Sequence, residues 1–208
     1  MIQKYNYWFF DKALSDRTCD HLLRYGKQFN YLKGQIGGLE EPSRLSKKQL
    51  KNLKNKRKSD VTWLSANWIF REIHPYIKMA NEKAGWNFQW DHSEAIQFTK
   101  YEVGEHYGWH ADGWQTPYNR PHNLKEHGKI RKLSVTCQLS DPADYKGGEL
   151  EFKVLLDSTG KTRTYDCKEA LPKGSIIVFP SYTVHKVKPV TSGTRYSLVL
   201  WNLGWPFK

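Results

Sequence analysis

The sequence has 208 residues, a length that fits one domain with a substantial hydrophobic core. Hydrophobic residues make up 38% of the chain and aromatic residues 14%, so the composition excludes a disordered polymer and indicates a globular protein. The formal net charge of +12 favours anionic partners in general, but charge alone does not select a class of substrate.

The N-terminal segment and the cysteines indicate the compartment. The sequence MIQKYNYWFFDKAL lacks the apolar run and the small-residue cleavage site of a signal peptide. No stretch approaches the roughly 20 uninterrupted apolar residues that a membrane span needs. The cysteines Cys19, Cys137 and Cys167 are widely spaced, without the CxxC pairs of a zinc site or the density of a disulfide scaffold. We therefore expect a cytoplasmic protein with reduced cysteines and no membrane segment.

The first part of the chain contains a predicted helix and a basic segment. In residues 14–29, Ser15 or Asp16 is suited to cap a helix, and the apolar side chains that follow fall close to one helical face. Residues 44–58 carry eight basic residues and no acidic one, with leucines too sparse to predict a helix. This basic run is more typical of a solvated or mobile surface than of a binding arm.

A second helical pattern covers residues 65–85. Its isoleucines repeat with helical spacing, whereas Pro75 should break or restart the helix and Gly85 should end it. Two short helices or one kinked helix would satisfy this pattern.

Beyond Gly85 the sequence changes to short runs rich in aromatic and β-branched residues, separated by turn-forming stretches. The predicted strands are 86–90, 95–102, 132–140, 149–156, 175–180 and 195–203. Because no long helical pattern intervenes, these strands should form a mostly antiparallel sandwich or barrel. The polar segment 115–129 is a long loop, and long loops in compact domains are often lids or binding loops.

Three residues have the composition of a metal site. His110 and Asp112 lie two positions apart in YEVGEHYGWHADGW, so their side chains project from the same face of an extended backbone. His185 follows directly after an apolar predicted strand, where a sheet would present a third ligand. Two histidines and one carboxylate form the facial triad that leaves coordination positions of Fe(II) open. A hydrolytic zinc site uses the same residue types and needs a general base in addition.

The strand beyond His185 distinguishes between these two kinds of metal site. In KPVTSGTRYSLVLW, Arg195 and Ser197 alternate onto the same face. An isolated arginine is explained most simply by a salt bridge within the chain. Beside three candidate metal ligands, however, its planar fork matches a carboxylate of a bound anion, and a hydrolytic zinc site gives no reason for it. The set therefore favours an oxygenase that binds the distal carboxylate of 2-oxoglutarate through Arg195.

Several separate stretches of the sequence carry a family pattern. They are IQFTKYEVGEHYGWHAD, RKLSVTCQLSDPADYKGGELEF and PKGSIIVFPSYTVHKVKPVTSGTRYSLVLWNLG, with a weaker one in RKSDVTWL. Together they cover most of residues 57–204, and their order and spacing are far more specific than any one motif. In this pattern the chain resembles the prolyl 4-hydroxylase-like family of 2-oxoglutarate oxygenases, which includes the iron-regulated bacterial PKHD-type hydroxylases.

The resemblance implies a mainly β fold with flanking N-terminal helices, built as a mostly antiparallel double-stranded β-helix, or jelly roll. We expect a single domain over 1–208, with 1–85 as a helical support region and 86–208 as the jelly-roll core. The implied site residues are the iron ligands His110, Asp112 and His185, the 2-oxoglutarate anchor Arg195 assisted by Ser197, and the pocket tyrosines Tyr101 and Tyr107. Trp109 and Trp114 flank the metal ligands and are candidates for a substrate groove or for packing in equal measure.

Two further matches to the family and two departures from it concern single positions. Gly147 and Gly148 match a turn of the family, and we expect them to serve backbone geometry rather than chemistry. Gln138 stands where some animal members carry a tyrosine that contacts 2-oxoglutarate, and Arg195 stands where many members use lysine. These two departures argue against assigning the substrate of the animal members to this chain.

The resemblance also implies a reaction. We expect hydroxylation of a substrate C–H bond with Fe(II) and 2-oxoglutarate, yielding succinate and CO2, with ascorbate as a reductant. A protein or peptide is the expected substrate, with a prolyl residue as the first target and no membrane partner. The net charge and the run 44–58 support a nucleic-acid oxidative demethylase as an alternative. A non-catalytic jelly-roll binding module is a third hypothesis, and the complete ligand set argues against it.

Overall fold

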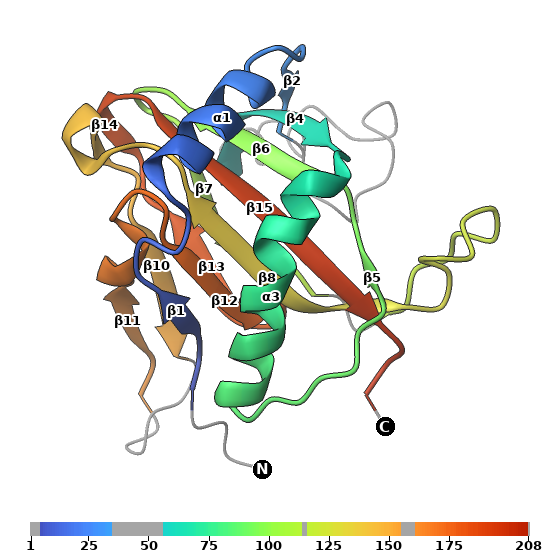
Figure 1. The fold of residues 1–208 in the computed structure, drawn as a ribbon. Helices are drawn as coiled ribbons and strands as arrows, with labels where there is room; N and C mark the ends of the chain where they lie inside the picture. The colour runs from blue at the N-terminus through green and yellow to red at the C-terminus, as the bar shows by residue number, and fades with distance from the viewer. Residues whose placement is uncertain (1–4, 35–55, 114–115, 155–160, 208) are drawn as a thin grey trace, which may run out of the picture.

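The computed structural model describes residues 5–34, 56–113, 116–154 and 161–207. Within them, antiparallel strands form two large sheets and one two-stranded sheet, and two helices lie across one face of the larger sheet (Figure 1). The helices are α1 (Asp16–Gly26) and α3 (Asn67–Lys83). The chain is therefore mainly β with helices from its N-terminal part, as the sequence predicts.

The larger sheet contains eight strands. Their bounds are β1 (Trp8–Phe10), β2 (Leu32–Lys33), β4 (Asp60–Leu64), β5 (His92–Ser93), β6 (Ile96–Tyr101), β8 (Ile130–Gln138), β12 (Ile176–Pro180) and β15 (Arg195–Gly204). The order across the sheet is β1-β12-β8-β15-β6-β4-β2, and β5 pairs with the end of β15. The longest strands, β8 and β15, thus lie side by side at the centre of the sheet.

The second sheet faces the inner side of the first. Its strands are β3 (Arg57–Lys58), β7 (His106–His110), β10 (Leu150–Val154), β11 (Arg163–Asp166) and β13 (Val184–Val187), and the two-stranded sheet contains β9 (Tyr145–Gly147) and β14 (Val190–Gly193). The order of the strands in the second, five-stranded sheet is β11-β10-β13-β7-β3. This pairing places His185 of β13 directly opposite His110 of β7, although the two residues are far apart in the sequence.

Helix α1 begins and packs as the sequence predicts. Ser15 is its N-cap, and the Ser15 hydroxyl accepts a hydrogen bond from the backbone N–H of Thr18 at 3.1 Å. Cys19 and Leu22 point toward the larger sheet and are fully buried. Cys19 has a free, buried thiol, and so do Cys137 and Cys167.

Helix α3 runs without interruption through Pro75, so the prediction that this proline breaks or restarts the helix is wrong. Pro75 is exposed, and its ring lies on the face of the helix away from the sheet. On the opposite face Ile69, Ile73 and Ile77 are fully buried. Burial of each isoleucine stabilises the helix by about 2 kcal/mol, which together outweighs the loss of about 3 kcal/mol from an internal proline. Gly85, with a φ of 71°, ends the helical segment as predicted.

Segment 86–90 is not a strand, so this prediction is also wrong. The backbone of Phe88 forms its hydrogen bonds with the side chain of Asn81 instead of with a neighbouring strand. The Asn81 amide donates to the Phe88 carbonyl at 2.9 Å, and the side-chain carbonyl of Asn81 accepts from the Phe88 N–H at 2.9 Å. The alternating aromatic residues instead pack partly buried against the core, as Phe88 and Trp90 show. Their spacing reflects side-chain burial rather than backbone pairing.

The other predicted strands correspond to β6, β8, β10, β12 and β15. Along β15, alternate side chains serve two different environments. Leu198 and Leu200 belong to the main core, between the larger sheet and the helices. Arg195 and Ser197 point the other way, into a cavity between the two large sheets. One strand therefore both anchors the core and lines the interior cavity.

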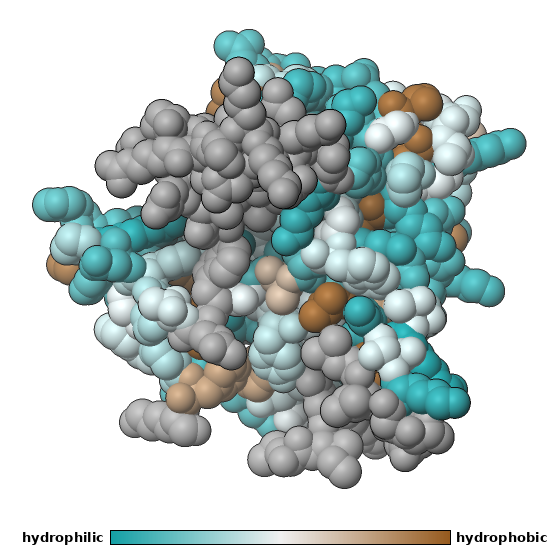
Figure 2. Space-filling model, turned by 180° about the vertical axis from the view of Figure 1, so that it is seen from behind, coloured by the Kyte–Doolittle hydropathy of each residue, from teal (hydrophilic) through white to brown (hydrophobic). Residues whose placement is uncertain are grey.

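The exterior provides two further observations. Seen from behind in Figure 2, the described surface is mostly hydrophilic, with hydrophobic residues in small separate patches. Among the described residues, no helix combines the length and the apolar character that a bilayer crossing would require. Residues 44–55 of the basic run lie outside the described residues, whereas Arg57 and Lys58 form β3.

Candidate functional site

The three candidate metal ligands converge at the paired strands β7 and β13 of the second sheet. His110 ends β7, Asp112 follows it by two residues, and His185 lies on the neighbouring strand β13. Nε2 of His110 is 3.6 Å from Oδ1 of Asp112, and Nε2 of His185 is 3.7 Å from Oδ2 of the same carboxylate. One ligand atom from each residue lies within 4.8 Å of the other two. The fold thus brings together the residues that the sequence singled out.

The two histidine rings are held with Nε2 toward the centre. Nδ1 of His110 is 2.8 Å from the Gly108 carbonyl oxygen, and Nδ1 of His185 is 2.9 Å from that of Thr183. Because a carbonyl only accepts hydrogen bonds, each Nδ1 carries a hydrogen, and each Nε2 faces the centre. Burial, together with the neighbouring His185, lowers the pKa of His110 to about 3. Both rings are therefore oriented as metal ligands need to be, and the lowered pKa keeps the ring of His110 neutral near neutral pH.

The carboxylate of Asp112 has the electrostatic character expected of a cation site. Asp112 is only 6% exposed, and its Oδ2 has no hydrogen-bond partner among the described residues. Burial alone would raise its pKa, but His185, His110 and Arg131 together bring the pKa below its usual value. A buried anion with an unsatisfied oxygen is costly by itself and is compensated by a bound cation. The residues present thus fit a divalent metal such as Fe(II).

Arg195 lies across the same cavity and is a buried cation that no carboxylate of the described residues neutralises. Its residue is 3% exposed, and its guanidinium donates to the Ser197 hydroxyl at 3.4 Å. No carboxylate of the described chain lies within 4.0 Å of it. A Cβ on Gly148, which has a φ of 68°, would lie 2.9 Å from Cδ of Arg195. Glycine therefore leaves room for this arginine, which is suited to pair with a bound carboxylate.

Tyr101 and Tyr107 also line the cavity. The ring of Tyr107 stacks on that of His110, with centroids 3.5 Å apart and an interplanar angle of 12°. Burial raises the pKa of Tyr107 to about 12, and burial also raises the pKa of Tyr101. Both hydroxyls therefore stay protonated near neutral pH and are available as hydrogen-bond donors to an anion.

Trp109 does not line this cavity. Trp109 precedes His110 on β7 and so points to the other side of the sheet. There its ring lies 4.6 Å from the ammonium of Lys186 and 5.8 Å from that of Lys153. Trp114 falls outside the described residues. Gln138, at 2% exposure, donates to the Tyr145 hydroxyl at 2.9 Å and is not among the cavity residues.

A second buried arginine beside the cavity was not singled out from the sequence. Arg57 donates to the Ser59 hydroxyl at 3.0 Å and to the Gln97 carbonyl oxygen at 3.1 Å. Its guanidinium carbon lies 4.6 Å from the ring centroid of Tyr107. The weak motif RKSDVTWL contained the signal, because its arginine and serine alternate onto one face of an extended chain.

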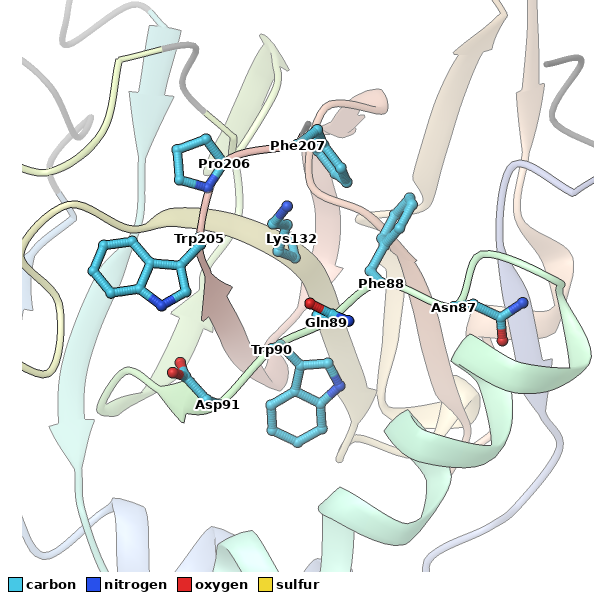
Figure 3. A pocket seen from close by; sticks show the side chains of 9 residues that line it. All are labelled: Asn87, Phe88, Gln89, Trp90, Asp91, Lys132, Trp205, Pro206 and Phe207. Carbon is cyan, nitrogen blue, oxygen red and sulfur yellow. The ribbon is translucent and has the colours of Figure 1, made fainter.

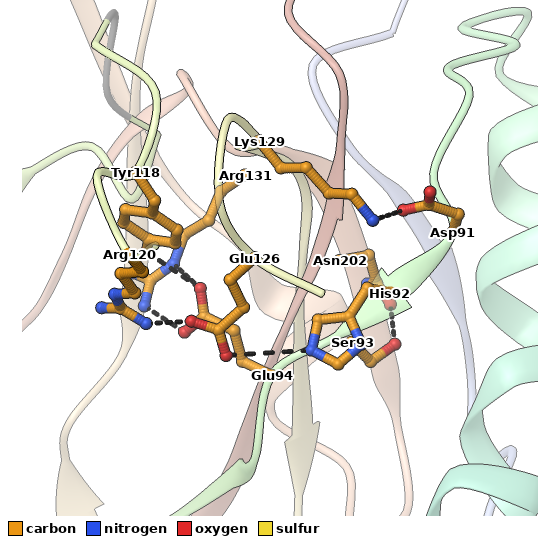
Figure 4. A network of polar contacts seen from close by, with 10 residues as sticks. All are labelled: Asp91, His92, Ser93, Glu94, Tyr118, Arg120, Glu126, Lys129, Arg131 and Asn202. Carbon is orange, nitrogen blue, oxygen red and sulfur yellow. Dashed lines mark hydrogen bonds and ion pairs between the residues drawn. The ribbon is translucent and has the colours of Figure 1, made fainter. Parts of the chain in front are cut away.

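A network of ion pairs ties the loop after Asp112 to the larger sheet (Figure 4). Arg131 donates to both carboxylate oxygens of Glu94, at 2.8 and 2.5 Å, and the Tyr118 hydroxyl donates to the same carboxylate at 2.9 Å. The Arg131 guanidinium lies 3.8 Å from the ring of Trp201, which lines the cavity. Through this network, Tyr118 of the described loop segment (116–129) is hydrogen-bonded to the same carboxylate that pairs with Arg131.

Replacing Glu94 by glutamine is expected to destabilise the protein by about 3 kcal/mol, because it leaves Arg131 as a buried, unpaired cation. The side chains of this pair are only 12% and 9% exposed. Asp166→Asn is the matched control, since Asp166 pairs with Lys188 at 2.7 Å while the two side chains are 39% and 33% exposed, and this loss should stay under about 1 kcal/mol. Urea unfolding of both variants measures the difference. Equal losses would contradict a special role of the buried pair.

Comparison with known proteins identifies the sequence relatives of this chain. The model of the 2OG-Fe(II) oxygenase superfamily matches residues 96–202, a segment that includes all three candidate metal ligands and Arg195. A PKHD-type hydroxylase of Synechococcus sp. (strain CC9902) is 42% identical over 108 residues, which are 51% of this chain and 40% of that protein. The PKHD-type hydroxylase YbiX of Escherichia coli O1:K1 / APEC is 39% identical over 105 residues, or 50% of this chain and 40% of that protein. The chain thus matches about two fifths of the length of these relatives.

Solved structures share the fold over nearly the whole chain. The viral collagen prolyl hydroxylase of Paramecium Bursaria Chlorella virus-1 aligns with a TM-score of 0.63 over 97% of each chain, at 19% identity. A Pseudomonas putida prolyl-4-hydroxylase aligns with a TM-score of 0.60 at 16% identity, covering 96% of this chain and 92% of that one. At these identities the likeness shows the fold alone, and it confirms the predicted jelly roll. The superfamily match adds the family: the chain belongs to the 2OG-Fe(II) oxygenase superfamily.

Proposed function

We propose that this protein is an Fe(II)- and 2-oxoglutarate-dependent dioxygenase that hydroxylates a C–H bond of its substrate. Membership in the superfamily implies Fe(II) as the metal and 2-oxoglutarate as the cosubstrate. The observation that carries the proposal is that one cavity contains two buried and unsatisfied charges, one negative and one positive. The buried carboxylate of Asp112 faces two imidazole nitrogens, and the buried guanidinium of Arg195 has no acidic partner in the described chain.

The residues of this cavity divide the work of binding. His110, Asp112 and His185 would hold the iron, and Arg195 with Ser197 would hold the distal carboxylate of 2-oxoglutarate. When bound, the iron and 2-oxoglutarate supply the oxidising chemistry, with succinate and CO2 as the products beside the hydroxylated substrate. The hydroxyls of Tyr101 and Tyr107 are placed to donate hydrogen bonds to the cosubstrate.

The apolar part of the cavity wall has a separate role. Leu150, Phe179 and Val199 line the cavity beside the charged groups. Such side chains exclude water, which strengthens the pairing between Arg195 and a carboxylate and protects the reacting groups from solvent. The protein thus orients and shields, while the charged residues select the metal and the cosubstrate.

For the substrate, we propose a prolyl residue of a protein or peptide. The sequence relatives are named PKHD-type hydroxylases, and several structures that share the fold are named prolyl hydroxylases. One of them, from Trichoplax adhaerens, is in complex with a peptide fragment of hypoxia inducible factor. These names support a peptide substrate by analogy, and an experiment on this chain is needed to test it.

The test is a substrate screen with a mass readout. The protein would be incubated with Fe(II), 2-oxoglutarate and ascorbate together with either proline-containing peptides or methylated oligonucleotides. We expect succinate formation that depends on the peptide, and a gain of one oxygen atom at a prolyl residue. Loss of a methyl group from the oligonucleotides without peptide oxidation would overturn the peptidyl assignment. Absence of any 2-oxoglutarate turnover, with or without substrate, would overturn the enzyme assignment.

A further inference from the structure

A second concave site lies outside the metal cavity, where segment 87–91, Lys132 of β8 and segment 205–207 meet (Figure 3). We call it the aromatic groove. It has a volume of about 650 Å³, which is within the range of about 300–1,000 Å³ typical of ligand sites. Two features of this groove point to a ligand: a cation that no acid of the described chain neutralises, and aromatic rings that are left exposed.

The cation is Lys132, at the floor of the groove. The residue is only 3% exposed, and its ammonium lies 3.3 Å from the ring centroid of Phe207. No carboxylate of the described chain lies within 4.0 Å of it, and the acidic residue of the groove, Asp91, is already paired with Lys129 at 2.6 Å. Burial lowers the pKa of Lys132, and the contact that faces its ammonium is the ring of Phe207 rather than an anion of the described chain.

The walls of the groove are aromatic and unusually open. Trp205 is 62% exposed and Phe207 is 49% exposed, while the ring of Phe88 meets that of Phe207 edge-on with centroids 4.9 Å apart. Figure 3 shows these rings around the ammonium of Lys132, with Trp205 on one side and Phe88 on the other. Clustered exposed rings are typical of surfaces that pack against a partner, and aromatic-lined grooves suit prolyl and other apolar side chains.

The groove lies next to the metal cavity but is distinct from it. The backbone N–H of Ser181 donates to the Lys132 carbonyl at 3.0 Å, and the Ser181 carbonyl accepts from the Gly113 N–H at 2.7 Å. Gly113 directly follows Asp112, so two backbone hydrogen bonds through Ser181 connect Lys132 of the groove to the residue beside the candidate metal ligand Asp112. The residues of the groove do not line the metal cavity.

We propose that the aromatic groove binds an extended peptide segment in which a carboxylate side chain lies beside proline or another apolar residue. The carboxylate pairs with the ammonium of Lys132, and the apolar neighbours pack on Phe88, Trp205 and Phe207. Charge complementarity selects an acidic partner, because the groove offers an uncompensated buried cation on a protein of net charge +12. This binding is independent of the proposed enzymatic reaction.

The experiment measures peptide binding to the full chain by fluorescence anisotropy, without iron or 2-oxoglutarate. One fluorescein-labelled peptide alternates proline with glutamate, and a matched peptide alternates proline with glutamine. We expect the glutamate peptide to bind at least about tenfold more tightly, which corresponds to about 1.4 kcal/mol. Lys132→Met, which keeps the length of the side chain, should remove this preference, and Trp205→Ala should weaken both peptides. Lys146→Met, at an exposed lysine of β9, is the control and should change neither affinity.

Several outcomes would overturn the proposal. Equal affinity of the two peptides, absence of binding, or a preference that survives in Lys132→Met would each do so. If Lys132→Met fails to fold, as judged by thermal unfolding, the peptide preference of the unmodified chain and the effect of Trp205→Ala still decide the question. Concentration-dependent dimerisation that Trp205→Ala abolishes would instead show that a second copy of this chain occupies the groove.

Discussion

Replacing Asp112 by asparagine is expected to abolish iron binding and all 2-oxoglutarate turnover. The substitution keeps the size of the side chain but removes the negative charge between His110 and His185. Loss of hydrogen-bond partners behind metal ligands typically costs 10- to 100-fold in metal affinity, so we expect loss of a direct ligand to cost more than about 100-fold. Fe(II) binding, measured under anaerobic conditions, and succinate formation should both fall to background.

The stability of the metal-free Asp112→Asn variant provides a second readout. In the metal-free protein, His185, His110 and Arg131 favour the charged form of Asp112, which lowers its pKa, and a neutral asparagine loses these interactions. We therefore expect the melting temperature of the variant without metal to lie somewhat below that of the unmodified protein. The increase in melting temperature on adding a divalent metal should disappear. Asp144→Asn, at an exposed carboxylate, is the control. Iron-dependent turnover in the Asp112 variant would rule out this residue as a ligand.

Replacing Arg195 by methionine is expected to weaken 2-oxoglutarate binding by about 100-fold while Fe(II) binding stays unchanged. Truncating one partner of a buried, hydrogen-bonded charge pair typically costs 2–5 kcal/mol, and each 1.4 kcal/mol is a factor of ten. Without cosubstrate, the variant should be more stable than the unmodified protein, because it no longer buries an unpaired guanidinium. The KM for 2-oxoglutarate and the thermal shift on adding it measure the effect.

Two further variants separate charge from geometry at this position. Arg195→Lys keeps the positive charge but loses the planar fork, so its loss of 2-oxoglutarate affinity should be smaller than that of Arg195→Met. Arg17→Met removes an exposed guanidinium of α1 and should change nothing. An unchanged KM for 2-oxoglutarate in Arg195→Met would show that this arginine does not hold the cosubstrate.

Local patterns predicted those parts of the fold in which one physical effect dominates. Helix α1 begins at the predicted cap, because Ser15 satisfies a free N–H of the first turn. The central strands were predicted because short runs of β-branched and aromatic residues between turns favour a strand over a helix. Pro75 and segment 86–90 were predicted wrongly, because burial of isoleucines against a sheet and the side chain of Asn81 decide them. Both depend on residues that become neighbours only after folding.

Strand alternation explains most of what was predicted about the candidate site. It indicated that His110 and Asp112 share a face, and that Arg195 and Ser197 do so as well. The same rule places the side chain of Trp109 on the opposite face of β7 from that of His110. The hypothesis that Trp109 lines a substrate groove did not take this alternation into account. For Arg57, the motif RKSDVTWL indicates only that its side chain shares a face with Ser59, whereas its burial follows from the pairing of β3 with β7.

The sequence by itself determined the residue types and the spacing of the site: two histidines, an aspartate and an arginine on extended segments, in an order that resembles one family. Only the tertiary structure decided that His185 lies opposite His110, that Glu94 neutralises Arg131, and that Arg195 and Lys132 have no acidic partner in the described chain. The physical reason is that a period-two pattern fixes which face a side chain takes. Which strands pair, and hence which charges meet, depends on packing across the whole core.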